Sequence, residues 1–226
     1  MLLSVYGDSI ATAYGLRPAQ GFVPKLANNF ATFSKRYANY INFAQDGMTS
    51  WDLASALGYH IDWRAGLREA DTICILIGGD DLIQALPLWL TSSSKSAVQR
   101  ALIYSRQAYF SVISTAVSLQ KRQSTMAIGT IYNPFPNTPV AAEAINLYNE
   151  QIIVPAAQKF SVPIAPVHAA FAGSEPQLIR GYSNGVAGSS NKHSAQIPIH
   201  PNAQGQSVIA GVFADALQFS THSPKK

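Results

Sequence analysis

Short apolar runs alternate with longer stretches of helical spacing along most of the chain. Residues 72–77 are apolar and β-branched without alternation, which is typical of a strand buried on both faces. Other short runs predict strands at residues 2–6, 41–44, 125–130 and 162–167. Helical spacing predicts helices over residues 22–37, 94–119, 140–160 and 201–219, and a further helix that starts at Trp51 and is capped by Ser50.

This alternation predicts an α/β fold, a three-layer α/β/α sandwich with a five-stranded parallel sheet. No repeat, linker or change of composition divides residues 1–226, so we expect a single domain. Ligands bind at the carboxyl ends of the strands in such folds. Those ends carry polar or glycine-rich segments here, at residues 7–9, 46–47, 78–80 and 133.

Composition and charge narrow the classes of function. Hydrophobic residues make up 47% of the chain and charged residues only 12%, which predicts a globular protein with an uncharged polar surface. The net charge of +4 is spread out, so we expect no nucleic-acid partner. No apolar run approaches the ~18 residues of a membrane span, so no integral membrane segment is expected.

No basic region precedes the first apolar stretch, so no signal peptide is visible and a cytoplasmic location is expected, or secretion if a leader was removed. The single cysteine, Cys74, excludes an intrachain disulfide and lies within a buried strand, which predicts an inert thiol. Neither a phosphate-binding glycine loop with lysine nor a zinc-type Cys/His spacing is present. We therefore expect no metal and no other cofactor. No pattern indicates the oligomeric state.

Two residues at opposite ends of the chain are candidates for nucleophilic catalysis. Ser9 follows the first predicted strand, and His200 precedes the last predicted helix. A serine hydroxyl becomes a strong nucleophile when a base takes its proton, and His200 is the leading candidate for that base. The backbone amides of Ser9 and Gly47 are candidates to stabilise an oxyanion. Each signal is weak alone, because a serine after a strand is more often a turn residue and a lone histidine more often structural.

Four segments in order resemble the GDSL, or SGNH-hydrolase, family. They are Gly7-Asp8-Ser9-Ile10, the segment from Asn42 to Ser50, the segment from Ile77 to Leu82, and the segment from His200 to Gly205. The resemblance spans nearly the whole chain and implies a flavodoxin-like sandwich of SGNH type that hydrolyses esters of a small or lipid-like substrate. It further implies that Ser9 attacks, that His200 moves the proton, and that the amides of Ser9 and Gly47 and the side chain at position 80 hold the oxyanion.

Two positions depart from the family pattern. Asp80 stands where the family has asparagine, and a carboxyl group donates a hydrogen bond to an oxyanion only when it is protonated, which predicts an acid-shifted pH optimum. Ile197 stands where the family has the aspartate that orients the imidazole. We expect a Ser9–His200 dyad in which a backbone carbonyl accepts the Nδ1 proton, with Glu175 as the alternative acid.

Three functions remain open from the sequence. The first is ester hydrolysis through an acyl-enzyme on Ser9. The second is a catalytically silent binding protein that retains the fold and the pocket, and the third is an acyltransferase that uses another alcohol in place of water. Asp8 and Asp81 are expected to support the site by fixing their own turns through backbone hydrogen bonds.

The segment Gly181-Tyr-Ser183-Asn-Gly185 matches the nucleophile elbow of α/β-hydrolases. That motif requires a preceding strand, a following helix and then an acid and a histidine in that order, which this sequence does not offer. A loop is therefore the favoured interpretation. The surrounding stretch, residues 173–198, is rich in Gly, Ser, Asn and Pro, and we expect it to act as a lid over the site.

Overall fold

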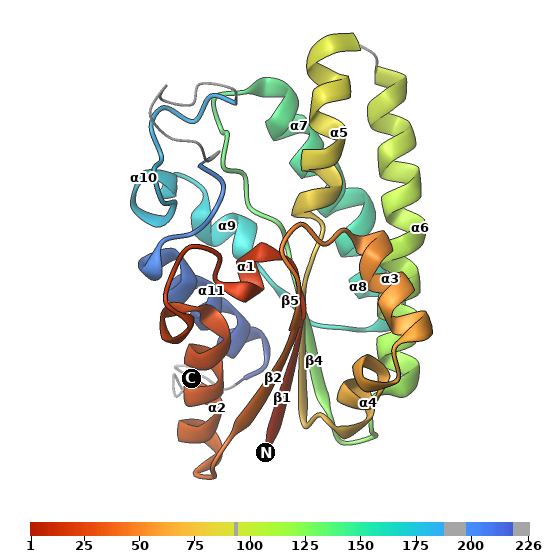
Figure 1. Ribbon diagram of the computed structural model, residues 1–226, viewed down its shortest axis with the longest axis vertical. Coiled ribbons are helices and arrows are strands. Elements are labelled where there is room, and N and C mark those ends of the chain that lie inside the picture. The colour runs from red at the N-terminus through yellow and green to blue at the C-terminus, as the bar shows by residue number, and fades with distance from the viewer. Residues whose placement is uncertain (93–94, 188–197, 219–226) are drawn as a thin grey trace, which may run out of the picture.

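A five-stranded, all-parallel sheet forms the centre of the molecule (Figure 1). The computed structural model describes residues 1–92, 95–187 and 198–218. The strand order is β2-β1-β3-β4-β5, and the predicted α/β fold is confirmed. The strands are β1 (Leu2–Gly7), β2 (Asn39–Ala44), β3 (Thr72–Leu76), β4 (Thr125–Gly129) and β5 (Ile164–Ala165).

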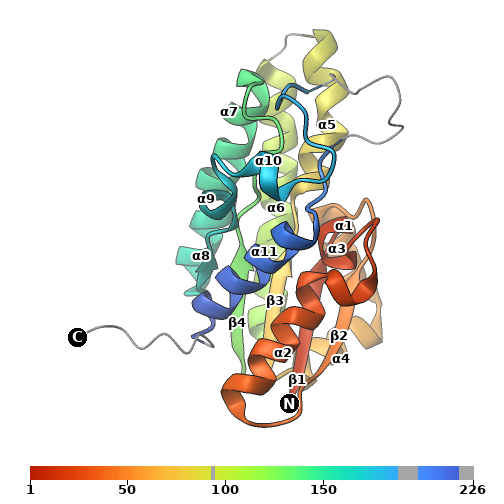
Figure 2. The same cartoon turned by 90° about the vertical axis from the view of Figure 1, so that its left-hand side faces the viewer.

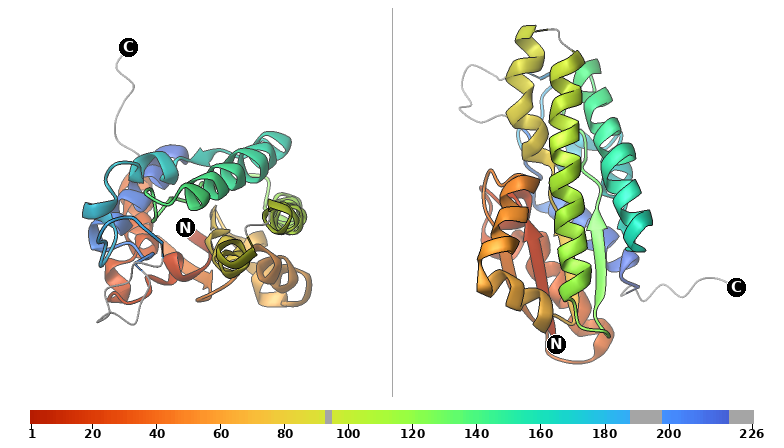
Figure 3. Two further views of the ribbon diagram at one scale, coloured as in Figure 1. Left: turned by 90° about the horizontal axis from the view of Figure 1, so that it is seen from above. Right: turned by 90° about the vertical axis from the view of Figure 1, so that its right-hand side faces the viewer.

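Helices cover both faces of this sheet, and each face has its own apolar core. One face carries α2 (Phe22–Ser34), α9 (Val167–Phe171), α10 (Glu175–Leu178) and α11 (Ala203–Ala216) (Figure 2). The other carries α3 (Ser50–Tyr59), α4 (Ile61–Glu69), α6 (Lys95–Leu119) and α8 (Val154–Phe160) (Figure 3). Above the carboxyl ends of the strands lie α1 (Ser9–Thr12), α5 (Gly79–Ser92) and α7 (Pro139–Tyr148) (Figure 1).

The register of the central strands explains why residues 72–77 are apolar without alternation. Cys74 pairs with Val5 on one side and Ala127 on the other, and all three side chains pack under α2 and α11. Their chain neighbours Tyr6 and Ile75 pack on the opposite face, because successive side chains of a strand point to opposite sides. Every residue of β3 is buried, as predicted.

Helix boundaries differ from the predicted ones where a polar side chain intervenes. The helix expected to begin at Trp51 begins at Ser50, because the hydroxyl of Thr49 accepts a hydrogen bond from the amide of Asp52 and caps it. The helix expected over residues 140–160 is interrupted by a π-helical turn, Asn149–Ile153, which separates α7 from α8. Asn149 bonds both the amide and the carbonyl of Ile131, so its side chain pairs with the chain beyond β4.

Two helices lie where the sequence analysis predicted none. The chain after β3 enters α5 at Gly79, although Gly78-Gly79 gives no helix-start signal. Within the predicted lid, residues 175–178 form α10, and residues 188–197 lie outside the described part of the chain, so the lid hypothesis stays a prediction.

One buried glutamine joins the first and the last parts of the chain. The Oε1 atom of Gln206 accepts a hydrogen bond from the amide of Phe22 at 2.8 Å, and its Nε2 atom donates to the carbonyl of Ile10 at 2.9 Å. The side chain is only 1% exposed. Gln206 therefore fixes α11, which follows His200, against α1, which begins at Ser9.

Replacing this glutamine by leucine should lower the free energy of unfolding by about 2–4 kcal/mol, because the Phe22 amide and the Ile10 carbonyl each lose a buried partner. Urea unfolding measures the change. Gln204→Leu is the matched control, since Gln204 is exposed on the same helix and the substitution should stay within about 0.5 kcal/mol of the wild type. Equal stability of the two variants would show that the buried bonds contribute nothing.

Candidate active site

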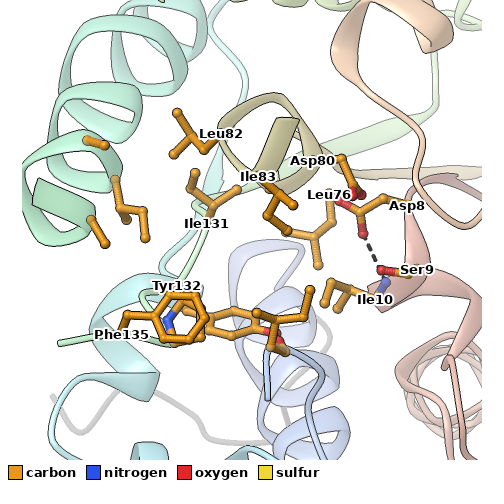
Figure 4. A pocket seen from close by; sticks show the side chains of 16 residues that line it. Asp8, Ser9, Ile10, Leu76, Asp80, Leu82, Ile83, Ile131, Tyr132 and Phe135 are labelled. Carbon is orange, nitrogen blue, oxygen red and sulfur yellow. Dashed lines mark hydrogen bonds between the residues drawn. The ribbon is translucent and has the colours of Figure 1, made fainter. Parts of the chain in front are cut away.

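The fold brings together two residues that are 191 positions apart in the chain. The Oγ atom of Ser9 lies 3.0 Å from Nε2 of His200, which is hydrogen-bonding distance. Ser9 is the first residue of α1, and Asp8 caps this helix by accepting the amide proton of Ile10 at 2.9 Å (dashed line in Figure 4). The amide of a first helical residue has no partner within the helix, so the Ser9 amide is available to bind an anion.

Three neighbours set the position and the pKa of His200. The ring of Tyr14 lies against the imidazole with 4.7 Å between ring centroids, and the carbonyl of His200 accepts the amide proton of Arg180 at 2.9 Å. Burial and the positive charge of Arg180 lower the pKa of His200, while the charge of Asp46 acts in the opposite direction. A lowered pKa keeps the imidazole neutral, which is the form that accepts a proton.

The third member of a triad is not found among the residues that the structure describes. Within them, no carboxylate forms a hydrogen bond or an ion pair with His200. Ile197 lies outside the described residues, so the proposed loss of the family's aspartate stays a prediction. Glu175 is buried at the start of α10 and is not among the charges that shift the pKa of His200.

The loop between β2 and α3 is fastened to α1. Asn42 donates to the carbonyl of Ala11 at 2.8 Å, and the hydroxyl of Thr12 donates to Asp46. Gly47 follows with φ of +77°, a conformation that side-chain-bearing residues rarely adopt, although a Cβ would meet no atom within 4 Å. The backbone angle therefore accounts for this glycine. Gly47 borders a polar hollow with Asp52 and Trp63 rather than the pocket that Ser9 lines.

Asp81 makes contacts beyond the expected one. Besides a hydrogen bond with its own backbone, its side chain accepts two hydrogen bonds from Ser50, one from the amide at 2.8 Å and one from the hydroxyl at 2.5 Å. This pair joins the first turn of α5 to the first turn of α3. The loop that carries Gly47 follows β2, and Asp80 follows β3, which is separated from β2 by β1 in the sheet. The two bonds between Ser50 and Asp81 therefore fix this loop relative to Asp80. The sequence carried no signal for this long-range pairing.

The carboxyl groups around Ser9 are buried close to one another. Burial and the charge of Asp80 raise the pKa of Asp8 to about 8. Burial and the charges of Asp81 and Asp46 raise the pKa of Asp80 to about 6. Asp8 is therefore mainly uncharged at neutral pH, and Asp80 gains its proton in mildly acidic solution.

A pocket extends from Ser9 between α5, α7 and the loop after β4 (Figure 4). Asp8, Ser9 and Asp80 line one end of it, and most of the remaining lining side chains are apolar. Among the described residues, no group of three or more His, Cys, Asp or Glu side chains is arranged to hold a metal ion. Within the same residues, no helix is long and apolar enough to cross a membrane.

Two other sequence features lie outside this site. Ser183 lies in an exposed loop with no strand before it and no helix directly after it, so the nucleophile elbow does not form. Cys74 is fully buried in β3, and burial raises the pKa of its thiol. Neither residue offers a reactive group beside the pocket.

The chain matches the sequence profile of the GDSL-like lipase/acylhydrolase family over residues 5–208 and belongs to that family. The lipase Lip_vut3 from a goat rumen metagenome has a similar structure, with a TM-score of 0.78 over 96% of this chain and 97% of that one at 18% identity. The acetylxylan esterase Axe2 from Geobacillus stearothermophilus gives 0.72 over 99% and 97% at 16% identity. TesA gives 0.63 over 96% and 98% at 21% identity. These structural similarities show a common fold. The comparison with curated protein sequences gave no match.

The raised pKa of Asp8 predicts how stability depends on pH. The carboxyl has an ordinary pKa of 3.8 in the unfolded chain and about 8 in the fold, so the unfolded chain binds fewer protons between these values and stability falls as pH rises through them. Asp8→Asn keeps a carbonyl oxygen for the Ile10 amide and cannot ionise. Its free energy of unfolding should exceed that of the wild type by at least about 1.4 kcal/mol at pH 8 and approach it at pH 4.

Urea unfolding of both proteins at the two pH values provides the measurement, and other titrating groups cancel because the two chains share them. A constant difference between wild type and variant from pH 4 to pH 8 would contradict the raised pKa of Asp8.

Proposed function

We propose that this protein hydrolyses carboxylic esters through an acyl-enzyme on Ser9, with His200 as the general base. The observation that carries the proposal is the 3.0 Å separation of the Ser9 hydroxyl and His200 Nε2. Such a pair activates a serine, because the histidine accepts the hydroxyl proton as the oxygen attacks. Membership of a family of lipases and acylhydrolases supports the same chemistry.

The reaction proceeds in two halves. Oγ of Ser9 forms a bond to the ester carbonyl carbon while its proton moves to Nε2 of His200, and the protonated imidazole then gives this proton to the leaving alcohol as the ester C–O bond breaks. In the second half, water gives a proton to Nε2 and attacks the acyl-enzyme. Collapse of that intermediate returns the proton to Ser9 and releases the acid.

The oxyanion of each tetrahedral intermediate is held by the amide of Ser9 and by Asp80 in its protonated form, because both residues line the same pocket. A contribution from the amide of Gly47, which borders the other hollow, stays a prediction. Only the neutral carboxyl has a hydrogen to donate, whereas the ionised one repels the oxyanion. The raised pKa of Asp80 supports this role, because it brings protonation into a mildly acidic range in which the lowered pKa of His200 still leaves imidazole present as a base.

Removing either partner of the dyad should lower kcat for p-nitrophenyl butyrate by at least about 10³. The variants are Ser9→Ala and His200→Ala, assayed between pH 4 and 9, with circular dichroism to verify folding. Ser183→Ala is the matched serine control and should retain full activity. Undiminished hydrolysis by Ser9→Ala would contradict the proposal.

The same assay separates the two alternative functions. A silent binding protein shows no turnover of the wild type at any pH while it still binds a ligand. An acyltransferase transfers the acyl group to an added alcohol in preference to water. Either result would replace the hydrolase proposal.

Asp80→Asn tests the oxyanion role, because an amide donates at every pH. The wild-type rate should fall as Asp80 ionises above its pKa of about 6, whereas the variant should retain its rate and reach its optimum at higher pH. At pH 8 the variant should be about 10-fold to 100-fold faster than the wild type. A pH–rate profile of kcat/KM for both proteins decides this. If rate and optimum are unchanged, the side chain at position 80 does not contact the oxyanion.

A further inference from the structure

The pocket beside Ser9 separates its polar groups from its apolar ones. Twelve of its sixteen lining residues are apolar or glycine, and the polar ones are Asp8, Ser9, Asp80 and Tyr132. Figure 4 shows Asp8, Ser9 and Asp80 together at one end. The hydroxyl of Tyr132 donates to the carbonyl of Ile199, so it is already engaged within the protein. Away from Ser9, the surface that a ligand would contact in this pocket is therefore mainly hydrocarbon.

The position of His200 indicates which part of an ester this pocket receives. The leaving alcohol departs next to Nε2 of His200, because it takes its proton there. Neither His200 nor Tyr14, whose ring lies against it, is among the lining residues of the pocket. The pocket is therefore placed to take the other substituent of the carbonyl carbon, which is the acyl chain.

The chemistry of the pocket defines the acyl group that fits it. Hydrocarbon gains free energy on transfer into such a lining, so each additional methylene improves binding until the pocket is full. A carboxylate or ammonium on the chain would lose its hydration without gaining a partner in the apolar part. A negative charge near Ser9 would also be repelled by Asp80 whenever that carboxyl is ionised.

We propose that the preferred substrates are esters of neutral fatty acids with an acyl chain longer than acetyl, whose alkyl chain lies in the pocket between α5 and α7. This inference rests on the proposed ester hydrolysis at Ser9 and adds the substrate class. Acetyl esters leave the pocket empty, and acyl groups that carry a charge are disfavoured.

The first experiment is a chain-length series. For p-nitrophenyl esters from acetyl upward, kcat/KM should rise by up to about fourfold per methylene and reach at least about tenfold over acetyl at the octanoyl ester. The hemisuccinate ester, which has the same chain length as butyrate with a terminal carboxylate, should be cleaved more slowly than butyrate. An acetyl ester that is cleaved as well as the octanoyl ester, with both rates lost in Ser9→Ala, would overturn the acyl assignment and leave the hydrolase proposal standing.

The second experiment shortens the pocket. Ala144 on α7 lines it and is buried, so Ala144→Leu should lower kcat/KM for the octanoyl ester at least about tenfold more than kcat/KM for the acetyl ester, with circular dichroism to verify folding. Ala142→Leu on the same helix is the matched control, because Ala142 does not line the pocket. Ala141→Leu, at another lining position, replaces Ala144→Leu if that variant does not fold.

A third measurement does not depend on turnover. Fatty amides from acetamide to decanamide should bind the wild type more tightly as the chain lengthens, and Ala144→Leu should remove this trend in calorimetry. If no ester is hydrolysed but the trend in binding holds, the hydrolase proposal fails and the ligand class stands. If acetate esters of long alcohols, rather than long acyl esters, lose activity in Ala144→Leu, the pocket holds the alcohol and the inference is wrong.

Discussion

The contact between the Ser9 hydroxyl and the His200 imidazole is the interaction on which the rest of the site depends. It joins a residue at the end of the first strand to one that precedes the last helix, so it exists only in the completed fold. Apolar packing of α11 against α2 brings these ends together, and Gln206 fixes their relative position through its two buried bonds. Hydrophobic burial therefore supplies the driving force, and a few buried hydrogen bonds supply the geometry.

A second constraint is the number of carboxyl groups at the same edge of the sheet. Asp8, Asp80 and Asp81 are all buried or half-buried there, the charges of Asp80 and Asp81 raise the pKa of Asp8, and the charge of Asp81 raises the pKa of Asp80. The fold satisfies Asp81 with two bonds from Ser50 and gives Asp8 the amide of Ile10. The carboxyl of Asp80 has fewer such hydrogen bonds to offset the cost of its burial. Its pKa of about 6 means that it gains its proton in mildly acidic solution. Under the proposed mechanism, the crowding that lowers stability at high pH also raises the pKa of Asp80 and so favours the protonated form that would donate to the oxyanion.

The strands, most of the helices and the α/β class could be predicted from local sequence patterns, because strand and helix signals depend on nearby residues. The apolar run of β3 and the turn at Asp8 could be predicted from spacing and residue type alone. The placement of Ser9 beside His200 could not be derived that way and came from the resemblance to a family. The bonds between Asp81 and Ser50 could not be predicted, because Ser50 lies in another crossover and no local pattern indicates a contact between the two. The apolar pocket was also hidden, since its walls come from five separate segments.

Covalent labelling with a fluorophosphonate, followed by mass spectrometry of the modified peptide, tests the central claim most directly. Such a reagent reacts with a serine whose hydroxyl is activated by a neighbouring base. We expect one adduct per chain, on Ser9, and its loss when His200 is replaced by alanine. An adduct on another residue such as Ser183, or an equal rate of labelling without the imidazole, would contradict it.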